Sequence, residues 1–264
     1  MFTAYWGLSG NVFDKSIKTE NLYPSKAFKE LNSRLDHMKQ NRGIMLITGE
    51  PGTGKTTTLR AFVNSLSDLS FKTFYVQLST VNVLDFYKQL NFKLCGQFLH
   101  LKSQLFASIQ KNIIELAQVR KKLPVIIFDE AHMLKNENFM ELQLLMNFNM
   151  DSIDPALIII AGQPHLYDRL SMPMMRAFFQ RIVLKATMPP LNKDEASAFI
   201  EHHLKLKGCP AFPFTQSAVE AIYKTSNGVP RQVAALCEKT MTLGMYQKIT
   251  ELTDEHVFQA SKEL

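Results

Sequence analysis

The sequence predicts an α/β fold, in which a five-stranded parallel sheet has helices on both faces and a small C-terminal helical lid domain follows. Two observations support this. Within residues 43–188, short apolar runs alternate with segments of helical periodicity, which is typical of a parallel sheet covered on both faces. From Met188-Pro189-Pro190 onward the strand-like runs stop and four helical segments follow. We therefore expect three parts: an N-terminal clasp and helix (1–42), an α/β core (43–188) and the lid (189–264).

Composition describes an ordinary globular chain of 264 residues, 46% hydrophobic and 20% charged. No apolar run approaches the ~20 residues needed to cross a bilayer, and the first residues lack the features of a signal peptide. Cys95, Cys209 and Cys237 are scattered without metal-ligand spacing, which indicates buried thiols in a reducing compartment. We expect a cytoplasmic protein without a membrane segment.

The elements follow from apolar periodicity and from turn residues. Residues 5–8 and 12–14 resemble an apolar clasp, and Ser25 is the expected cap of a helix that runs to Gln40. Strands are expected at 43–48, 72–78, 125–129, 156–161 and 181–185; helices are expected at 55–69, 82–96, 103–121, 136–150, from His165, and at 193–207, 215–226, 230–246 and 253–263.

The central motif is GEPGTGKTT, which joins the first strand to a helix. Glycines let backbone N–H groups surround phosphate oxygens, and the helix beginning at Lys55 adds its free N–H groups. Lys55 is placed to reach the β- and γ-phosphates, and Thr56 offers its hydroxyl to Mg2+. The predicted nucleotide-binding residues of this motif are Gly49, Glu50, Pro51, Gly52, Thr53, Gly54, Lys55, Thr56 and Thr57.

An acidic pair, Asp129-Glu130, closes the apolar strand 125–128. Ligands bind at the carboxyl ends of strands in such sheets, so we expect Asp129 to hold Mg2+ and Glu130 to polarise the attacking water. Asp129-Glu130-Ala131-His132 also spells a DEAH box, but a helicase of that type needs a second motor domain. His132 is interpreted as a packing or sensor-linking residue.

Further candidates lie after the last strands. Gln163 is expected to touch the γ-phosphate or the attacking water. Arg176 and Arg181, before and at the start of the last strand, are alternative fingers acting on a neighbouring subunit, or internal salt-bridge residues. Arg231 opens a lid helix after Pro230 and aims at the nucleotide. Tyr23 either borders the base or is a core aromatic.

Charge is unevenly distributed. Residues 193–264 carry eight Lys/Arg against nine Asp/Glu, whereas residues 1–192 carry 22 against 15, a net of +7. A basic nucleotide-binding part favours a phosphate-backbone partner, although many basic proteins bind no nucleic acid.

With these motifs in place, the chain resembles an AAA+ P-loop ATPase. More narrowly it resembles the ExeA-like group, which includes helpers of bacterial transposition (TniB, TnsC and MuB relatives). The markers are Tyr5-Trp6-Gly7-Leu8, Leu22-Tyr23-Pro24-Ser25, GEPGTGKTT, DEAH, Gly162-Gln163-Pro164, Gln180-Arg181-Ile182 and Gly228-Val229-Pro230-Arg231. Val12 stands where that group usually has Pro, and we expect no membrane segment or wall-binding domain after the lid, unlike in the secretion-type members.

The resemblance implies an ATP-dependent and Mg2+-dependent ATPase that assembles on double-stranded DNA as a ring or helical filament and recruits a transposase to target sites. It places DNA contacts after the second strand and along the next helices, at Ser79, Thr80, Lys88, Lys102, Ser103 and Lys111. Two alternatives stay open: a secretion-assembly ATPase, and a replication-initiator or helicase-loader ATPase.

Overall fold

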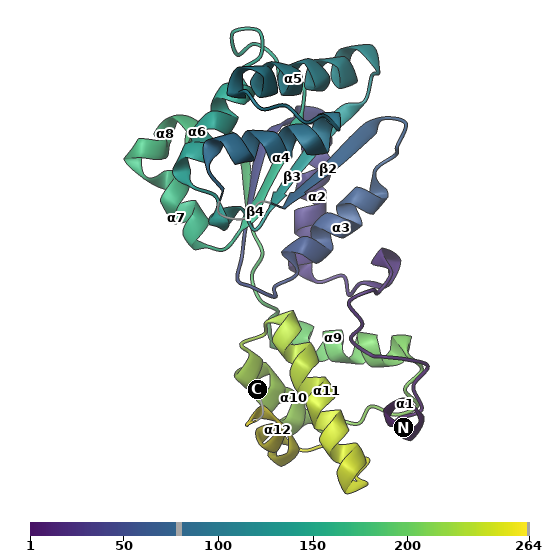
Figure 1. Cartoon of the computed structure of the whole chain (residues 1–264). Helices are drawn as coiled ribbons and strands as arrows, with labels where there is room; N and C mark the ends of the chain where they lie inside the picture. Colours follow the sequence, from purple (N-terminus) through teal and green to yellow (C-terminus); the bar gives the residue numbers. More distant parts are fainter. Residues whose placement is uncertain (78–80, 263–264) are drawn as a thin grey trace. The chain divides into compact units, whose positions relative to one another are not determined.

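The computed structural model describes residues 1–77 and 81–262. Their internal contacts divide them into two units. One contains residues 30–49 and 55–188; the other contains residues 1–29, 50–54 and 189–264. The first unit carries the sheet, and the second carries the C-terminal helices together with the N-terminal segment (Figure 1).

The sheet has five parallel strands in the order β2-β3-β4-β1-β5, which confirms the predicted fold class. The strands are β1 (Gly43–Thr48), β2 (Phe71–Gln77), β3 (Leu123–Asp129), β4 (Leu157–Gly162) and β5 (Ile182–Thr187). β1, β3 and β4 are buried along their whole length. This explains why they read as continuous apolar runs.

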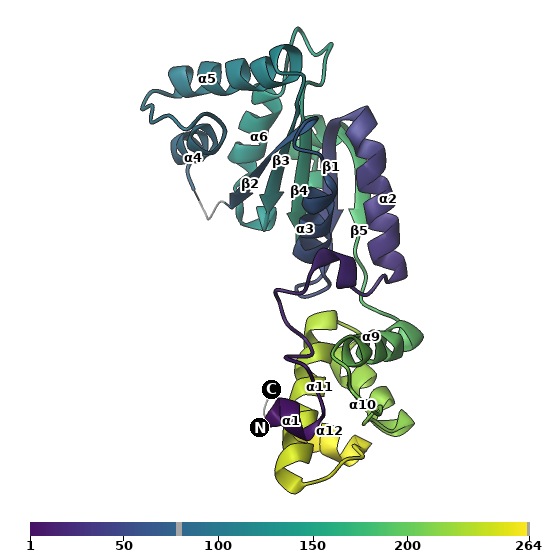
Figure 2. The ribbon, with the colours of Figure 1, turned by 90° about the vertical axis from the view of Figure 1, so that its right-hand side faces the viewer.

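Successive side chains of these strands point to opposite faces. On one face, Ile44, Ile126 and Ile158 pack in a single core with the helices α4 to α8. The opposite face carries α2 and α3; Figure 2 shows α2 on the other side of the sheet from α4 and α5. The helices are α2 (Lys26–Asn41), α3 (Lys55–Ser65), α4 (Val83–Cys95), α5 (Lys102–Ile114), α6 (Asn136–Leu145), α7 (His165–Ser171) and α8 (Arg176–Gln180), with short helical turns η2 (Glu115–Val119), η3 (Ala131–Met133) and η4 (Pro173–Met175).

The second unit has a separate core. Its elements are α1 (Phe2–Tyr5), η1 (Thr19–Asn21), α9 (Lys193–Leu206), α10 (Gln216–Ser226), α11 (Pro230–Gln247) and α12 (Asp254–Ser261). Trp6, Leu8 and Val12 are buried among residues of α9 to α11, and the indole Nε1 of Trp6 donates a hydrogen bond to the carbonyl of Met241 at 3.1 Å. The apolar clasp thus forms part of the core of the C-terminal helices.

Several predicted helix ends were wrong. The helix expected to reach Met150 ends at Leu145, because Asn149, Met150 and Asp151 adopt left-handed backbone conformations and Phe148 pairs with Ile153. The helix from Lys55 ends at Ser65 instead of at 69. The helix expected over 103–121 leaves α geometry after Ile114 and continues as the π-turn η2. Arg181 precedes β5 instead of starting it.

Candidate functional site

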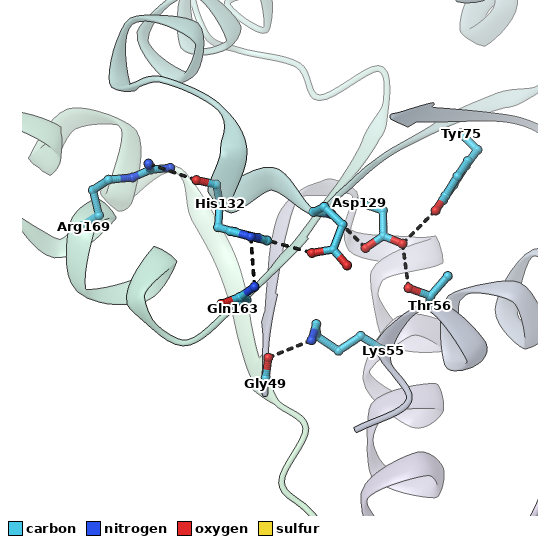
Figure 3. Close-up of polar contacts among 9 residues, drawn as sticks. Gly49, Lys55, Thr56, Tyr75, Asp129, His132, Gln163 and Arg169 are labelled. Carbon is cyan, nitrogen blue, oxygen red and sulfur yellow. Dashed lines mark hydrogen bonds and ion pairs between the residues drawn. The ribbon is translucent and has the colours of Figure 1, made fainter. Parts of the chain in front are cut away.

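The phosphate-loop lysine is held at the base of the loop. Lys55 is the first residue of α3, is 6% exposed, and donates a hydrogen bond from Nζ to the carbonyl oxygen of Gly49 at 2.7 Å (Figure 3). Gly49 follows the last residue of β1, and Thr57 is half-buried in the first turn of α3. The ammonium is therefore within the loop, where a phosphate oxygen can replace the carbonyl as its acceptor.

Glycines set the path of the loop itself. Gly52 and Gly54 have φ of 86° and 105°, conformations that side chains disfavour. A Cβ at Gly52 would lie 2.9 Å from Cβ of Arg231, and the backbone N–H of Arg231 donates to the carbonyl of Gly52 at 3.3 Å. Thr53 closes the turn through its hydroxyl, which donates to the carbonyl of Glu50 at 2.8 Å, while Pro51 is exposed. The structure thus brings the start of α11 against the loop.

The hydroxyl and carboxylate expected to share a metal lie together. Thr56 Oγ1 donates a hydrogen bond to Asp129 Oδ2 at 2.7 Å, although the two residues are 73 positions apart. Asp129 is 4% exposed at the end of β3. Hard oxygen donors of this kind are the ligands that Mg2+ prefers, and it usually takes one or two protein ligands together with phosphate oxygens. The described residues hold no cluster of three or more His, Cys, Asp or Glu suited to a metal.

Tyr75 is a site residue that sequence reasoning missed. Its hydroxyl donates to the same Oδ2 of Asp129 at 2.7 Å, and the amide of Gln77 lies 3.4 Å from that hydroxyl. Tyr75 lies on β2, which pairs with β3. Burial, followed by the hydrogen bond to Asp129, raises the pKa of Tyr75, so the phenol remains a donor at neutral pH.

Glu130 has an unusual backbone. Its φ is 52°, a left-handed conformation rare for a residue with a Cβ, and its N–H donates to Asp129 Oδ1 at 2.9 Å. The Glu130 side chain is 57% exposed. Strain of this sort at the end of a buried strand is typical of functional positions.

His132 and Gln163 meet beside Glu130. Gln163, which follows β4, has its amide Nε2 at 3.1 Å from Nε2 of His132 (Figure 3). Nδ1 of His132 lies 3.3 Å from Oε2 of Glu130 but makes no hydrogen bond among the described residues. Arg169 donates from Nη1 to the carbonyl of His132 at 3.2 Å. His132, interpreted from the sequence as a packing or sensor-linking residue, therefore lies between the two predicted site residues Glu130 and Gln163.

The candidate finger arginines differ in their surroundings. Arg181 makes an ion pair with Asp151, Nη1 to Oδ1 at 2.7 Å, and its side chain is 22% exposed. Arg176 is exposed at the start of α8. Arg231 is exposed and contacts Gly52 through its backbone. Of the two candidate arginine fingers, Arg181 therefore makes an ion pair within its own chain, which was the alternative role considered for it.

Tyr23 packs against aromatic rings of α9. It is half-buried, with its ring 5.9 Å from that of Phe199 and 5.7 Å from that of His202, both in α9. Its contact with the base of a nucleotide stays a prediction.

The residues suggested for DNA are spread over α4 and α5. Lys88 pairs with Asp85 at 3.7 Å, and Lys102 pairs with Glu141 at 2.6 Å and lies over the ring of Tyr87. Ser103 and Lys111 are exposed on α5. Ser79 and Thr80 lie outside the described residues.

A strand–loop–helix cradle after β1, with an acidic pair at the end of β3 one strand removed in this sheet order, defines a P-loop nucleotide-binding ATPase domain. Residues 37–170, slightly more than half of the chain, match the family model described as AAA domain. The chain belongs to this AAA family.

One curated relative is General secretion pathway protein A of Aeromonas hydrophila, which is 28% identical over 249 residues, 91% of this chain and 44% of the relative. This match supports the resemblance to the ExeA-like group; the transposition branch stays a prediction. The chain spans about half the length of the curated relatives it matches.

Solved structures share the fold. Cdc6p from Pyrobaculum aerophilum is similar with a TM-score of 0.72 at 17% identity, covering 96% of this chain and 70% of that one. Drosophila ORC bound to DNA is similar with a TM-score of 0.68 at 17% identity, covering 98% and 64%. At this identity the likeness is one of fold. In the described residues, no helix is long and apolar enough to span a membrane.

Proposed function

We propose that this protein is a Mg2+-dependent ATPase that works as a nucleotide-controlled switch on double-stranded DNA. The observation that carries the ATPase part is the contact of Thr56 with Asp129, beside the loop that holds Lys55. A hydroxyl that follows β1 and a buried carboxylate that ends β3 meet there, and the ammonium of Lys55 is bound to the carbonyl of Gly49 in the same loop, which are the groups that phosphoryl transfer requires.

In the proposed reaction each residue has one task. Lys55 leaves the carbonyl of Gly49 and binds the β- and γ-phosphates, and Thr56 and Asp129 hold Mg2+. Bound Mg2+ neutralises the charge that develops on the phosphate oxygens. Glu130 orients and deprotonates the attacking water, Gln163 contacts the γ-phosphate or that water, and Arg231 contacts the nucleotide from the lid.

Two variants test this assignment. Lys55→Ala is expected to abolish nucleotide binding, because the loop loses the cation that pairs with phosphate. Glu130→Gln is expected to bind ATP with wild-type affinity and to lower turnover at least about 100-fold, the scale of a general base. Turnover of Glu130→Gln at the wild-type rate contradicts the role of Glu130.

The finer part of the proposal is assembly on DNA and recruitment of a transposase. It is supported by the net +7 of residues 1–192 and by the ExeA-like motifs. The likeness to the fold of ORC, whose Drosophila structure is bound to DNA, agrees with such a partner. Self-association into a ring or filament would bring an arginine of one copy to the nucleotide of the next.

The second candidate is a secretion-assembly ATPase, favoured by the match to General secretion pathway protein A. A replication-initiator or helicase-loader role is the third, favoured by the fold shared with Cdc6p and ORC.

Steady-state ATPase measured with and without double-stranded DNA, over a salt series, separates these candidates. Stimulation by DNA that fades as salt rises supports assembly on DNA. A rate indifferent to DNA at low salt favours the secretion candidate. Stimulation by a purified transposase, or by a replicative helicase, then distinguishes the two DNA-bound roles.

A further inference from the structure

His132 lies where the turn η3 packs against the end of β4. It belongs to η3, directly after Glu130, and its side chain is only 10% exposed. Gly162, the last residue of β4, makes this approach possible: a Cβ there would lie 3.2 Å from the backbone nitrogen of His132 and 2.6 Å from a methyl of Leu166. A larger residue at position 162 would push η3 away from β4. The glycine therefore brings the imidazole against Gln163.

The hydrogen-bonding capacity of the ring defines its orientation. Burial lowers the pKa of His132, so the imidazole is neutral at pH 7 and has one donor and one acceptor nitrogen. Its Nε2 lies 3.1 Å from the amide nitrogen of Gln163, which is a donor, so Nε2 accepts. The tautomer inferred from this contact carries its proton on Nδ1.

That proton lies on the side of Glu130. Nδ1 is buried and makes no hydrogen bond among the described residues, and Oε2 of Glu130 lies 3.3 Å from it. The Glu130 side chain is 57% exposed, so a small rotation lets its carboxylate accept this N–H, and the bond then limits further rotation. The opposite tautomer would turn a lone pair toward the carboxylate and repel it. Arg169 donates a hydrogen bond to the backbone carbonyl of His132, which restrains the backbone position from which the imidazole extends.

We propose that His132 is a positioning residue through which Gln163 sets the orientation of Glu130: the glutamine amide selects the imidazole tautomer, and the imidazole N–H holds the carboxylate. The arrangement follows the logic of a catalytic residue oriented by a histidine that is itself oriented by a third group. This inference rests on the proposed ATPase function.

The test compares single and double variants by their steady-state kcat and KM for ATP. His132→Ala is expected to lower kcat about tenfold with KM and nucleotide affinity unchanged, because it loosens Glu130 and leaves the phosphate loop intact. His132→Asn, whose amide nitrogen falls near the position of Nδ1, is expected to recover kcat to within about threefold of the wild type. His132→Gln, which extends toward Gln163, is expected to stay as slow as the alanine variant.

A double-mutant cycle separates coupling from general damage. If Gln163 acts partly through His132, the variant carrying both His132→Ala and Gln163→Ala loses less than the product of the two single losses. His165→Ala is the matched control, because His165 packs its ring 5.2 Å from that of His132 but belongs to α7 and lies outside the chain of contacts; its kcat is expected within twofold of the wild type.

The outcomes are distinct. Wild-type kcat in His132→Ala, or single losses that simply multiply in the double variant, overturns the coupling while leaving the ATPase intact. Wild-type protein that does not hydrolyse ATP with Mg2+, with or without DNA, overturns the proposed function and the inference with it. Thermal melting of each variant shows whether it is folded, and His132→Asn keeps the proposal falsifiable if His132→Ala unfolds.

Discussion

The hydroxyl of Tyr75 donates a hydrogen bond to Oδ2 of Asp129 at 2.7 Å. The same oxygen accepts from Thr56, so two donors hold one carboxylate oxygen where the proposed metal binds. Groups that orient metal ligands typically change metal affinity 10–100-fold when removed. Tyr75→Phe is therefore expected to raise the Mg2+ concentration for half-maximal turnover about tenfold.

The measurement for Tyr75 is a Mg2+ titration of turnover, repeated for Mg2+-dependent nucleotide binding in the Glu130→Gln background. Tyr167→Phe, a change at an exposed tyrosine of α7, is the control and is expected to leave both curves in place. An unchanged Mg2+ requirement in Tyr75→Phe would show that the hydroxyl of Tyr75 does not affect metal binding by Asp129.

The two finger candidates make a second prediction. Because Arg181 is held by Asp151 and Arg176 is exposed, we expect Arg176 to act on the nucleotide of a neighbouring copy. Arg176→Ala is expected to lower assembled-state turnover about 1,000-fold, the lower range for arginine fingers. Mixing Arg176→Ala with Lys55→Ala protein is expected to restore activity, because one partner supplies an intact loop and the other an intact arginine.

A mixture that stays inactive while both variants still assemble would contradict a finger at Arg176. Arg181→Ala, mixed in the same way, is the comparison. Restoration with Arg181→Ala alone would assign the finger to Arg181 and require the pair with Asp151 to open.

DNA binding by Lys102 gives a third prediction. Lys102 pairs with Glu141 and lies over Tyr87, so it must leave a local partner to reach a phosphate. Lys102→Ala is expected to lower the log–log salt slope of DNA binding by about one unit. Lys205→Ala removes a lysine that pairs with Glu201 on α9 and is expected to leave the slope unchanged. Equal slopes in all three proteins would exclude Lys102 as a phosphate contact.

The parts of the site that the sequence predicts are those carried by local pattern. The apolar runs of β1, β3 and β4 locate the buried strands, and the residues after them are placed at one sheet edge by parallel geometry. Tyr75 could not be found this way, because its partner Asp129 lies 54 residues away on a neighbouring strand and β2 reads as an ordinary half-buried strand. Strand order is a tertiary property that periodicity does not contain.

The same limit explains the wrong end of α6. Residues 146–150 continue the mixed apolar and polar pattern of the helix, but Phe148 pairs with Ile153 and the chain turns through left-handed Asn149 and Asp151. Asn and Asp tolerate that conformation, so the sequence allows either a helix or a turn here, and the pairing of Phe148 with Ile153 favours the turn. The ion pair between Asp151 and Arg181 depends on this turn. The ion pair of Arg181 could therefore not be predicted, because the sequence pattern did not indicate this turn.

A last prediction concerns stability in the second unit. His203 is 5% exposed, with Phe13 and Phe199 rings at 5.4 and 4.4 Å, and burial, reinforced by the nearby His202, lowers its pKa to about 4. The unfolded chain has a histidine pKa near 6.5 and so binds more protons than the folded state between about pH 6.5 and 4. Stability is thus full above about pH 6.5 and falls as the pH drops through this window, by about 3 kcal/mol for this group.

His203→Gln removes the titrating group and is expected to flatten that part of the profile. Trp6, the single tryptophan of the chain, is buried in the same unit, so its fluorescence reports unfolding there. Denaturant titrations at pH 7 and pH 4 would compare the two proteins, since acidic groups contribute equally to both and cancel in the difference. If the wild type and His203→Gln lose the same free energy of unfolding, His203 is not the acid-sensitive group of this unit.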